Sequence, residues 1–353
     1  MLSRRRFLTG LAGLAALPAF ARAGQTQAIR LAAAWQADTG HHVGVLAPAG
    51  EGVLAIASAL RVPTRAHGLL RESSGNLLAV ARRPGDWLLR WSMDGRPLAW
   101  RWSEPGRAFA GHVLASADGR TLYTTEIDLE SGLGLIGVRD GASLEKRAEW
   151  PSLGRDPHML VHDATHPDAL LIANGGVPTR PETGRRKHDL ARMDSSLVRL
   201  DVRGGKALGQ WRLDDPRLSL RHLAWQGARL GIALQAEHDD PAAQAAAPVL
   251  ALFDGVNLAA VPAHMPLAGY AGDIAAWDTG YALGCPRAAG VALIAADGAW
   301  RGFLPLAEAC AAQATHAGLW VAGRGRALMW EPAALAQRLV VAEARLDNHW
   351  IAI

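Results

Sequence analysis

The segment IGVRDGASLEKRAEWPSLGRDPH, residues 136–158, contains the pattern that decides the fold. Two stretches with the composition of β-strands flank the turn Asp140-Gly141, as in a β-hairpin. The second stretch leads to His158, which stands directly before another apolar run. Near the N-terminus, VGVLAPAGEGVLAIASALRVPTRAH, residues 43–67, follows the same plan and ends at His67. The two segments align as the third and fourth strands of one kind of β unit.

Turns of the same type recur along the chain, each between apolar segments. They are Asp94-Gly95, Asp140-Gly141, Gly204-Gly205, Asp254-Gly255 and Asp297-Gly298. Their spacing is close to that of β-propeller blades, which are about 40–50 residues long. Only Pro332 to Gln337 looks helical, and only briefly. These features predict an all-β fold made of repeated hairpins.

A second landmark keeps the same period. A polar residue stands before the first strand of six of the seven predicted units, and the remaining unit begins at Ala311 without one. The six polar residues are His67, His112, His158, His222, Asp273 and His349. The predicted units are 28–66 with 349–353, 67–111, 112–157, 158–221, 222–272, 273–310 and 311–348. The sequence therefore predicts a seven-bladed β-propeller, similar to WD40 or YVTN repeats. The C-terminal strand would close it by pairing near Ala32-Trp35, which leaves no open sheet edge at the closure.

The N-terminal residues have the pattern of an export signal. Ser3 to Leu8 reads SRRRFL, a twin-arginine pattern, and a weakly apolar run and a small-x-small cleavage site at Ala21-Arg22-Ala23 follow it. We therefore expect a signal peptide at 1–23, a propeller domain at 24–353 and a periplasmic location. The apolar run is shorter than the roughly 20 residues of a membrane span, although an uncleaved anchor is the alternative. No other segment is long enough to span a membrane.

The overall charge excludes one class of partner. Four of the 37 Lys and Arg residues lie in the signal, which leaves 33 against 33 Asp and Glu. A nearly neutral chain without clustered positive charge does not predict nucleic-acid binding. Two cysteines, Cys285 and Cys310, could pair or stay free. The length and the 50% hydrophobic content allow a large core, and we expect a monomer.

The row of polar residues suggests a binding site. The first strand of every blade lines the central channel, so residues just before these strands gather at the channel mouth. Several imidazoles with one carboxylate could bind iron or another transition metal, with haem as a less favoured ligand. The candidate metal ligands are His67, His112, His158, His222, Asp273 and His349. Alternatively, each histidine forms a hydrogen bond within its own blade, as the Gly-His pair of WD repeats does.

A long insert occupies residues 174–196, between the second and third strands of its unit and on the same face as the polar row. Its basic residues could form a lid that holds a carboxylate or phosphate group, although an ordinary solvated loop has the same composition. The candidate ligand-binding residues are Arg155, Asn174, Arg180, Arg185 and Lys187. The glycines that follow Asn174 permit the backbone to turn out of the strand.

Several catalytic motifs are absent from the sequence. It contains no nucleophile elbow, Walker loop, HExxH motif or Cys-x-x-Cys-His motif. Covalent catalysis and c-type haem therefore have little support, and the sequence favours a binding protein over an enzyme. A metal-assisted hydrolase or oxidoreductase and a protein-interaction platform remain the alternatives.

The central segment resembles a bacterial family catalogued as domain of unknown function 1513. The matching residues are Gly154 to His158, Ala173 to Gly176, Thr183-Gly184-Arg185-x-Lys187 and Ser195 to Leu197. The resemblance implies an exported propeller protein. It also implies periplasmic iron handling, because the genes of that family lie near genes for imelysin-type and di-haem peroxidase-like proteins. We therefore expect a periplasmic binding or accessory protein for iron, another metal or a metal chelate.

Overall fold

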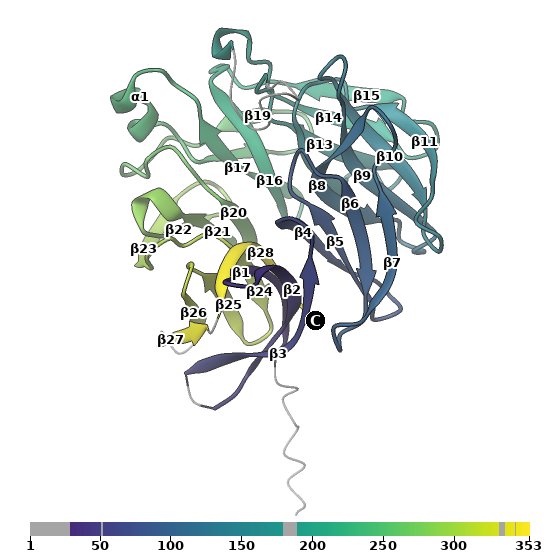
Figure 1. The fold of residues 1–353 in the computed structure, drawn as a ribbon. Helices are drawn as coiled ribbons and strands as arrows, with labels where there is room; N and C mark the ends of the chain where they lie inside the picture. Colours follow the sequence, from purple (N-terminus) through teal and green to yellow (C-terminus); the bar gives the residue numbers. More distant parts are fainter. Residues whose placement is uncertain (1–28, 51, 179–188, 332–335, 343) are drawn as a thin grey trace, which may run out of the picture.

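The computed structural model describes residues 29–50, 52–178, 189–331, 336–342 and 344–353. It shows seven four-stranded antiparallel blades arranged around a central channel (Figure 1). The predicted all-β, seven-bladed propeller is confirmed. In every blade the first strand lies at the channel and the fourth lies at the rim.

The strands of each blade follow one another outward from the channel. Blade 1 contains β28 (Arg345–Ala352), β1 (Leu31–Ala37), β2 (Gly40–Pro48) and β3 (Val53–Val62). Blade 2 contains β4 (Ala66–Arg71), β5 (Leu77–Ala81), β6 (Trp87–Trp91) and β7 (Pro97–Trp102). Blade 3 contains β8 (Arg107–Ala115), β9 (Thr121–Asp128), β10 (Gly134–Asp140) and β11 (Lys146–Pro151). Blade 4 contains β12 (Pro157–His162), β13 (Ala169–Asn174), β14 (Ser196–Asp201) and β15 (Ala207–Trp211).

The remaining three blades have the same order. Blade 5 contains β16 (Leu218–Gln226), β17 (Arg229–Ala236), β18 (Leu250–Phe253) and β19 (Leu258–Ala260). Blade 6 contains β20 (Asp273–Trp277), β21 (Gly280–Cys285), β22 (Gly290–Ala295) and β23 (Trp300–Pro305). Blade 7 contains β24 (Ala312–Thr315), β25 (Gly318–Ala322), β26 (Arg326–Glu331) and β27 (Ala336–Ala342).

The ring closes as the sequence predicts. Strand β28 pairs antiparallel with β1, with Leu31 opposite Ala352 and Ala33 opposite Trp350. Figure 1 shows β28, in yellow, beside β1, in purple. The seven inner strands contact one another in the order β28, β4, β8, β12, β16, β20 and β24, and β24 in turn contacts β28. The first blade is therefore built from both ends of the described chain.

Blades 1 and 7 are also joined at the rim. Strand β27 pairs in parallel with β3, with Val341 opposite Val53 and Ala342 opposite Leu54. The two blades consequently form one eight-stranded sheet. Each outer strand covers an edge that the other would leave open.

The core lies between the blades, and β1 shows how the sequence builds it. Its residues LAAAW are all buried, in two sets that alternate along the strand. Ala32 and Ala34 pack in the cluster that reaches blade 2, whereas Leu31, Ala33 and Trp35 pack in the cluster that reaches blade 7. Because both faces of the strand are covered, the sequence is a continuous apolar run without polar alternation.

The local predictions have mixed outcomes. All five Asp-Gly or Gly-Gly turns join the third and fourth strands of a blade, and Gly95 adopts a φ of 85° that favours glycine. The predicted helix at Pro332 to Gln337 is wrong where it can be compared, since Ala336 and Gln337 begin β27 and 332–335 lie outside the described residues. An α-helix forms instead at α1 (Pro241–Ala246), where Asp240 caps the first turn and accepts hydrogen bonds from the amides of Ala242 and Ala243.

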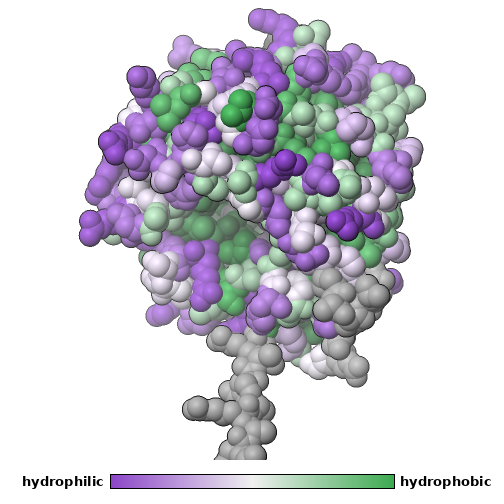
Figure 2. Space-filling model, turned by 180° about the vertical axis from the view of Figure 1, so that it is seen from behind, coloured by the Kyte–Doolittle hydropathy of each residue, from purple (hydrophilic) through white to green (hydrophobic). Residues whose placement is uncertain are grey.

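The visible surface is largely hydrophilic, and both cysteines lie in the interior. On the face seen in Figure 2, hydrophilic residues cover most of the surface and apolar residues lie mainly in recesses. Within the described ranges, no helix combines the length and the apolar character needed to cross a membrane. Cys285 and Cys310 are both free and buried. Burial raises the pKa of Cys285 to about 12 and also raises the pKa of Cys310.

Candidate metal centre

Five inner strands each bring one histidine to the channel. They are β4 with His67, β8 with His112, β12 with His158, β16 with His222 and β28 with His349. Each side chain is buried, with an exposed fraction between 4% and 8%. Histidines of five different blades, far apart in sequence, are therefore gathered in one place.

The backbone turns these side chains toward one another. In each of the five strands, the pairing with the second strand of the blade shifts register at the histidine, as in a β-bulge. The inner strands without a histidine, β20 and β24, pair in unbroken register. Because a bulge redirects the side chains near it, the convergence of the imidazoles is built into the strands.

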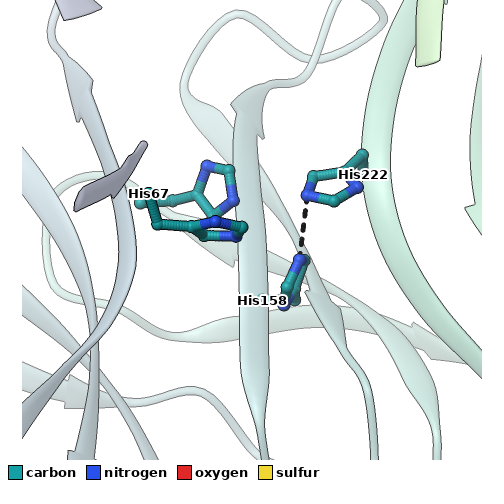
Figure 3. A group of neighbouring side chains, drawn as sticks. His67, His158 and His222 are labelled. Atoms are coloured by element: carbon teal, nitrogen blue, oxygen red, sulfur yellow. Dashed lines mark hydrogen bonds between the residues drawn. The ribbon is translucent and has the colours of Figure 1, made fainter. Parts of the chain in front are cut away.

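The ring nitrogens of four of these histidines lie close together. One nitrogen from each of His67, His112, His158 and His222 lies within 4.8 Å of the other three. His158 Nε2 and His222 Nε2 are 2.9 Å apart, and Figure 3 shows these two rings facing each other near His67. The ring centre of His349 is 4.5 Å from those of His67 and His222.

These distances can be compared with those around a bound metal. In a square-planar or octahedral arrangement with metal–nitrogen bonds of about 2.0–2.1 Å, adjacent ligand atoms are about 2.9 Å apart and opposite ones about 4.2 Å apart. The separation of His158 and His222 fits adjacent positions. It is also the separation of a hydrogen bond between the two rings. The four nitrogens lie within 4.8 Å of one another, so the imidazoles would have to move closer together to hold one ion.

Several ring nitrogens have no protein partner. The buried atoms without a hydrogen bond include His112 Nε2, His158 Nδ1, His222 Nδ1 and His349 Nε2. Leaving a buried polar atom unpaired costs about 1–3 kcal/mol. These four nitrogens therefore do not fit the alternative in which each histidine forms hydrogen bonds within its own blade.

The carboxylate of Asp273 supports one of the histidines. His349 Nδ1 lies 3.1 Å from Asp273 Oδ2, and the backbone amides of Ile274 and Ala312 donate to the same carboxylate. A proton held on Nδ1 leaves the Nε2 lone pair of His349 free for a ligand. Asp273 was expected as a metal ligand, but it is not part of the converging group and instead orients His349.

The surroundings keep the cluster of four converging imidazoles, those of His67, His112, His158 and His222, uncharged. The pKa values of His67, His112, His158 and His222 are held well below the usual value, mainly because burial disfavours the charged form. The neighbouring imidazoles lower these pKa values further. Neutral imidazole is the form that metal coordination requires, and the four histidines have this form at neutral pH.

A small cavity lies beside the cluster. It has a volume of about 30 Å³ and is lined by His67, Arg82, Arg83, His158, Arg221, His222, Gln235, Tyr270 and Asn348. Asp156 is bonded to Arg83 and, at 2.7 Å, to Arg221 Nη1. Glu237 Oε1 lies 4.0 Å from Arg221 Nη2. Buried arginines and carboxylates thus surround one side of the histidines.

The base of the insert rests on this ionic network. A Cβ atom at Gly175 would lie 2.6 Å from Asp156 Oδ2 and 2.9 Å from Arg221 Nη1. Gly176 adopts a φ of 71°, as expected for a glycine that turns the chain out of β13. Position 175 therefore needs glycine because the backbone approaches the ion pair closely.

The other predicted ligand-binding residues have different positions. Asn174 is fully buried, and its side-chain amide forms hydrogen bonds with Ser152 and Ser196. The side chain therefore links blade 3 to blade 4. Arg155 donates from Nη1 to the carbonyl of Ser131 at 2.9 Å, at the surface. The remaining three, Arg180, Arg185 and Lys187, lie outside the described residues.

Sequence reasoning missed the arginines of the cavity. Arg221 and Asn348 each directly precede a histidine of the cluster, so the spacing that located the histidines could have located them too. Arg82 and Arg83 follow β5, a second strand, and no periodic signal in the sequence connects them with the row.

The fold is shared with proteins of very different sequence. A candidate 6-phosphogluconolactonase of Bacteroides uniformis is 12% identical, with a TM-score of 0.61, covering 92% of this chain and 99% of the other. Kuenenia stuttgartiensis hydrazine synthase is 11% identical, with a TM-score of 0.58, covering 86% and 92%. A streptogramin B lyase is 11% identical, with a TM-score of 0.56, covering 80% and 84%. At these identities the likeness shows the fold alone.

The family comparison agrees with the resemblance seen in the central segment. No curated protein matches the chain in sequence. A family model described as "Protein of unknown function (DUF1513)" matches residues 60–353. This range includes all five channel histidines and the cavity arginines. The chain therefore belongs to the DUF1513 family.

Proposed function

We propose that the protein binds one transition-metal ion in the channel and serves as a metal-binding or accessory protein. The observation that carries the proposal is the convergence of four buried, neutral imidazoles within 4.8 Å. A fifth imidazole, oriented by Asp273, lies against them. In the described part of the chain, no other group of three or more potential ligands meets in this way.

The donor set indicates the class of metal. Neutral imidazole nitrogens suit zinc, copper, nickel and ferrous iron, whereas hard cations prefer oxygen ligands. The histidines are buried, and the cavity beside them has a volume of about 30 Å³, which fits an ion with a small ligand. This size argues against a haem or a metal chelate. The proposal is therefore an ion held directly by the protein, with iron included in its ferrous form.

A metal titration of matched variants tests this function. Full-length protein freed of metal with a chelator is titrated with Zn²⁺, Cu²⁺ and Fe²⁺, and binding is measured by calorimetry and metal analysis. We expect one ion per chain, and affinity at least about 100-fold weaker after His112→Ala with His222→Ala, because two ligands are lost. The control is His264→Ala with His316→Ala, two exposed histidines outside the cluster.

Two results would contradict the proposal. One is a wild-type chain that retains no ion. The other is a cluster variant that binds with the affinity and stoichiometry of the control. Circular dichroism on each variant separates a lost ligand from a lost fold. Protein that carries no metal when isolated from cells and binds none in vitro would favour the protein-interaction platform.

A metal-assisted hydrolase or oxidoreductase is a second candidate. The observation that favours it is the cavity beside His67, His158 and His222, where a bound ion could present a free coordination position. Turnover that vanishes on chelation and in the cluster variant, but not in the control variant, would identify an enzyme. Binding without any turnover would favour the accessory role.

The proposed location is the periplasm, reached by twin-arginine export. Residues 1–28 lie outside the described part of the chain, so the sequence pattern is the support. Replacing Arg4 and Arg5 with lysine is expected to leave the protein in the cytoplasm, as measured by cell fractionation. Undiminished export of this variant would indicate the general secretory route. Under this proposal the protein acts as a monomer with periplasmic iron-handling partners.

A further inference from the structure

The proposed ion would create an unbalanced buried charge. The four converging imidazoles are uncharged donors, and the converging group of ligands contains no carboxylate or thiolate. The carboxylate of Asp273 is engaged by His349 and two backbone amides, and the carboxylates of Asp156 and Glu237 lie against Arg221. Burying an uncompensated charge is strongly unfavourable. A divalent ion in this cluster therefore needs a negative partner.

The cavity offers a place for that partner, with donors already present. Arg221 lines it, is only 3% exposed, and has an Nε atom that is buried without a hydrogen-bond partner. Its Nη1 atom is engaged by Asp156 at 2.7 Å. Arg82 also lines the cavity and is close enough to lower the pKa values of His67 and His222. Guanidinium groups, which only donate hydrogen bonds, thus lie on the side of the cluster that faces the cavity.

The position of Arg221 is fixed by its neighbours. Asp156 holds one end of the guanidinium, and Glu237 lies near the other. The backbone at Gly175 packs directly on the pair formed by Arg221 and Asp156. Since these contacts leave little room for the guanidinium to move, the Nε–H is a preorganised donor beside the histidines.

We propose that a small inorganic anion binds in this cavity, as a ligand of the channel metal and as the acceptor of the Arg221 Nε–H bond. The inference rests on the proposed metal site. A water molecule needs about 10–15 Å³ of such space, so a cavity of about 30 Å³ accommodates an anion of one to three heavy atoms. Hydroxide, halides and azide are of this class, whereas phosphate and carboxylates larger than formate are too large.

Azide binding to the copper-loaded protein tests the inference. Full-length protein is loaded with Cu²⁺, its copper content is measured, and azide is added while the azide-to-copper absorption band is followed. We expect a saturable band with the wild type. Arg221→Lys and Arg82→Gln should weaken azide binding about 10-fold or more without lowering the copper content. Arg120→Gln, at a side chain that is 88% exposed, is the control and should bind azide like the wild type.

The outcomes separate this inference from the proposed function. Copper bound without any response to azide overturns the anion site and leaves the metal site standing. Absence of copper binding in the wild type overturns the metal site itself. If Arg221→Lys does not fold, Arg82→Gln provides the test, because it leaves the pair of Arg221 with Asp156 in place. Azide affinity that is unchanged in the folded arginine variants refutes the role of the cavity.

Discussion

Removing residues 345–353 is expected to leave a chain without a stable fold. The deletion takes away β28, and with it Trp350, which is 2% exposed and packs in one cluster with Trp35 and Trp320. Loss of one buried tryptophan side chain alone costs about 3–5 kcal/mol, and whole domains are stable by about 5–15 kcal/mol. The deletion also exposes the edge of β1 to other chains. Circular dichroism and size-exclusion chromatography should show lost structure or aggregation.

A point variant on the same strand is the control. His349→Ala removes one imidazole of the cluster but keeps the pairing of β28 with β1, so it should remain folded and monodisperse. A truncated chain that melts cooperatively near the wild-type temperature would mean that β28 is not needed for closure.

The stability of the metal-free protein is expected to fall steeply as the pH drops below about 6.5. Four buried histidines have pKa values well below the unfolded value near 6.5. In this range the unfolded chain therefore binds more protons than the folded one, so lowering the pH favours unfolding. Each histidine that stays neutral in the fold costs about 1.4 kcal/mol per pH unit. Their stabilising effect is fully present above about pH 7.

Urea unfolding at pH 5, 6, 7 and 8, in the presence of a chelator, measures this dependence. His112→Gln with His222→Gln removes two of the titrating groups, so its free energy of unfolding should vary less with pH than that of the wild type. Carboxylates elsewhere affect both proteins alike and cancel in the comparison. Parallel pH profiles for the two proteins would show that the buried histidines do not control acid stability.

The blade count and the closure could be predicted because both follow from local patterns. Each Asp-Gly turn occupies the same place in its blade, and the terminal residues HWIAI match the missing first strand of the unit that begins with β1. Patterns of this kind are visible along the chain. They require no knowledge of distant contacts.

The detailed chemistry of the site could not be predicted in this way. The bulges that turn the histidines inward depend on pairing with the neighbouring strand, so they cannot be predicted from single residues. Asp273 occupies the same register as the histidines, yet its contact with His349 gives it a different role. The helix at Pro241–Ala246 did have a local signal in the sequence, the capping residue Asp240 followed by proline.

The place of His349 on β28 gives a bound ion an effect on chain topology. The ion would link the last strand of the ring to His67 on β4 and would close a loop of almost the entire chain. Because an ion held in this way binds the folded chain and not the unfolded one, its binding free energy would add to the stability of the closed ring. Because Cys285 and Cys310 are free, the coordination bonds would be a reversible link between β28 and β4 in a protein without a bond between these cysteines. Release of the ion and opening of the ring would then be one coupled event.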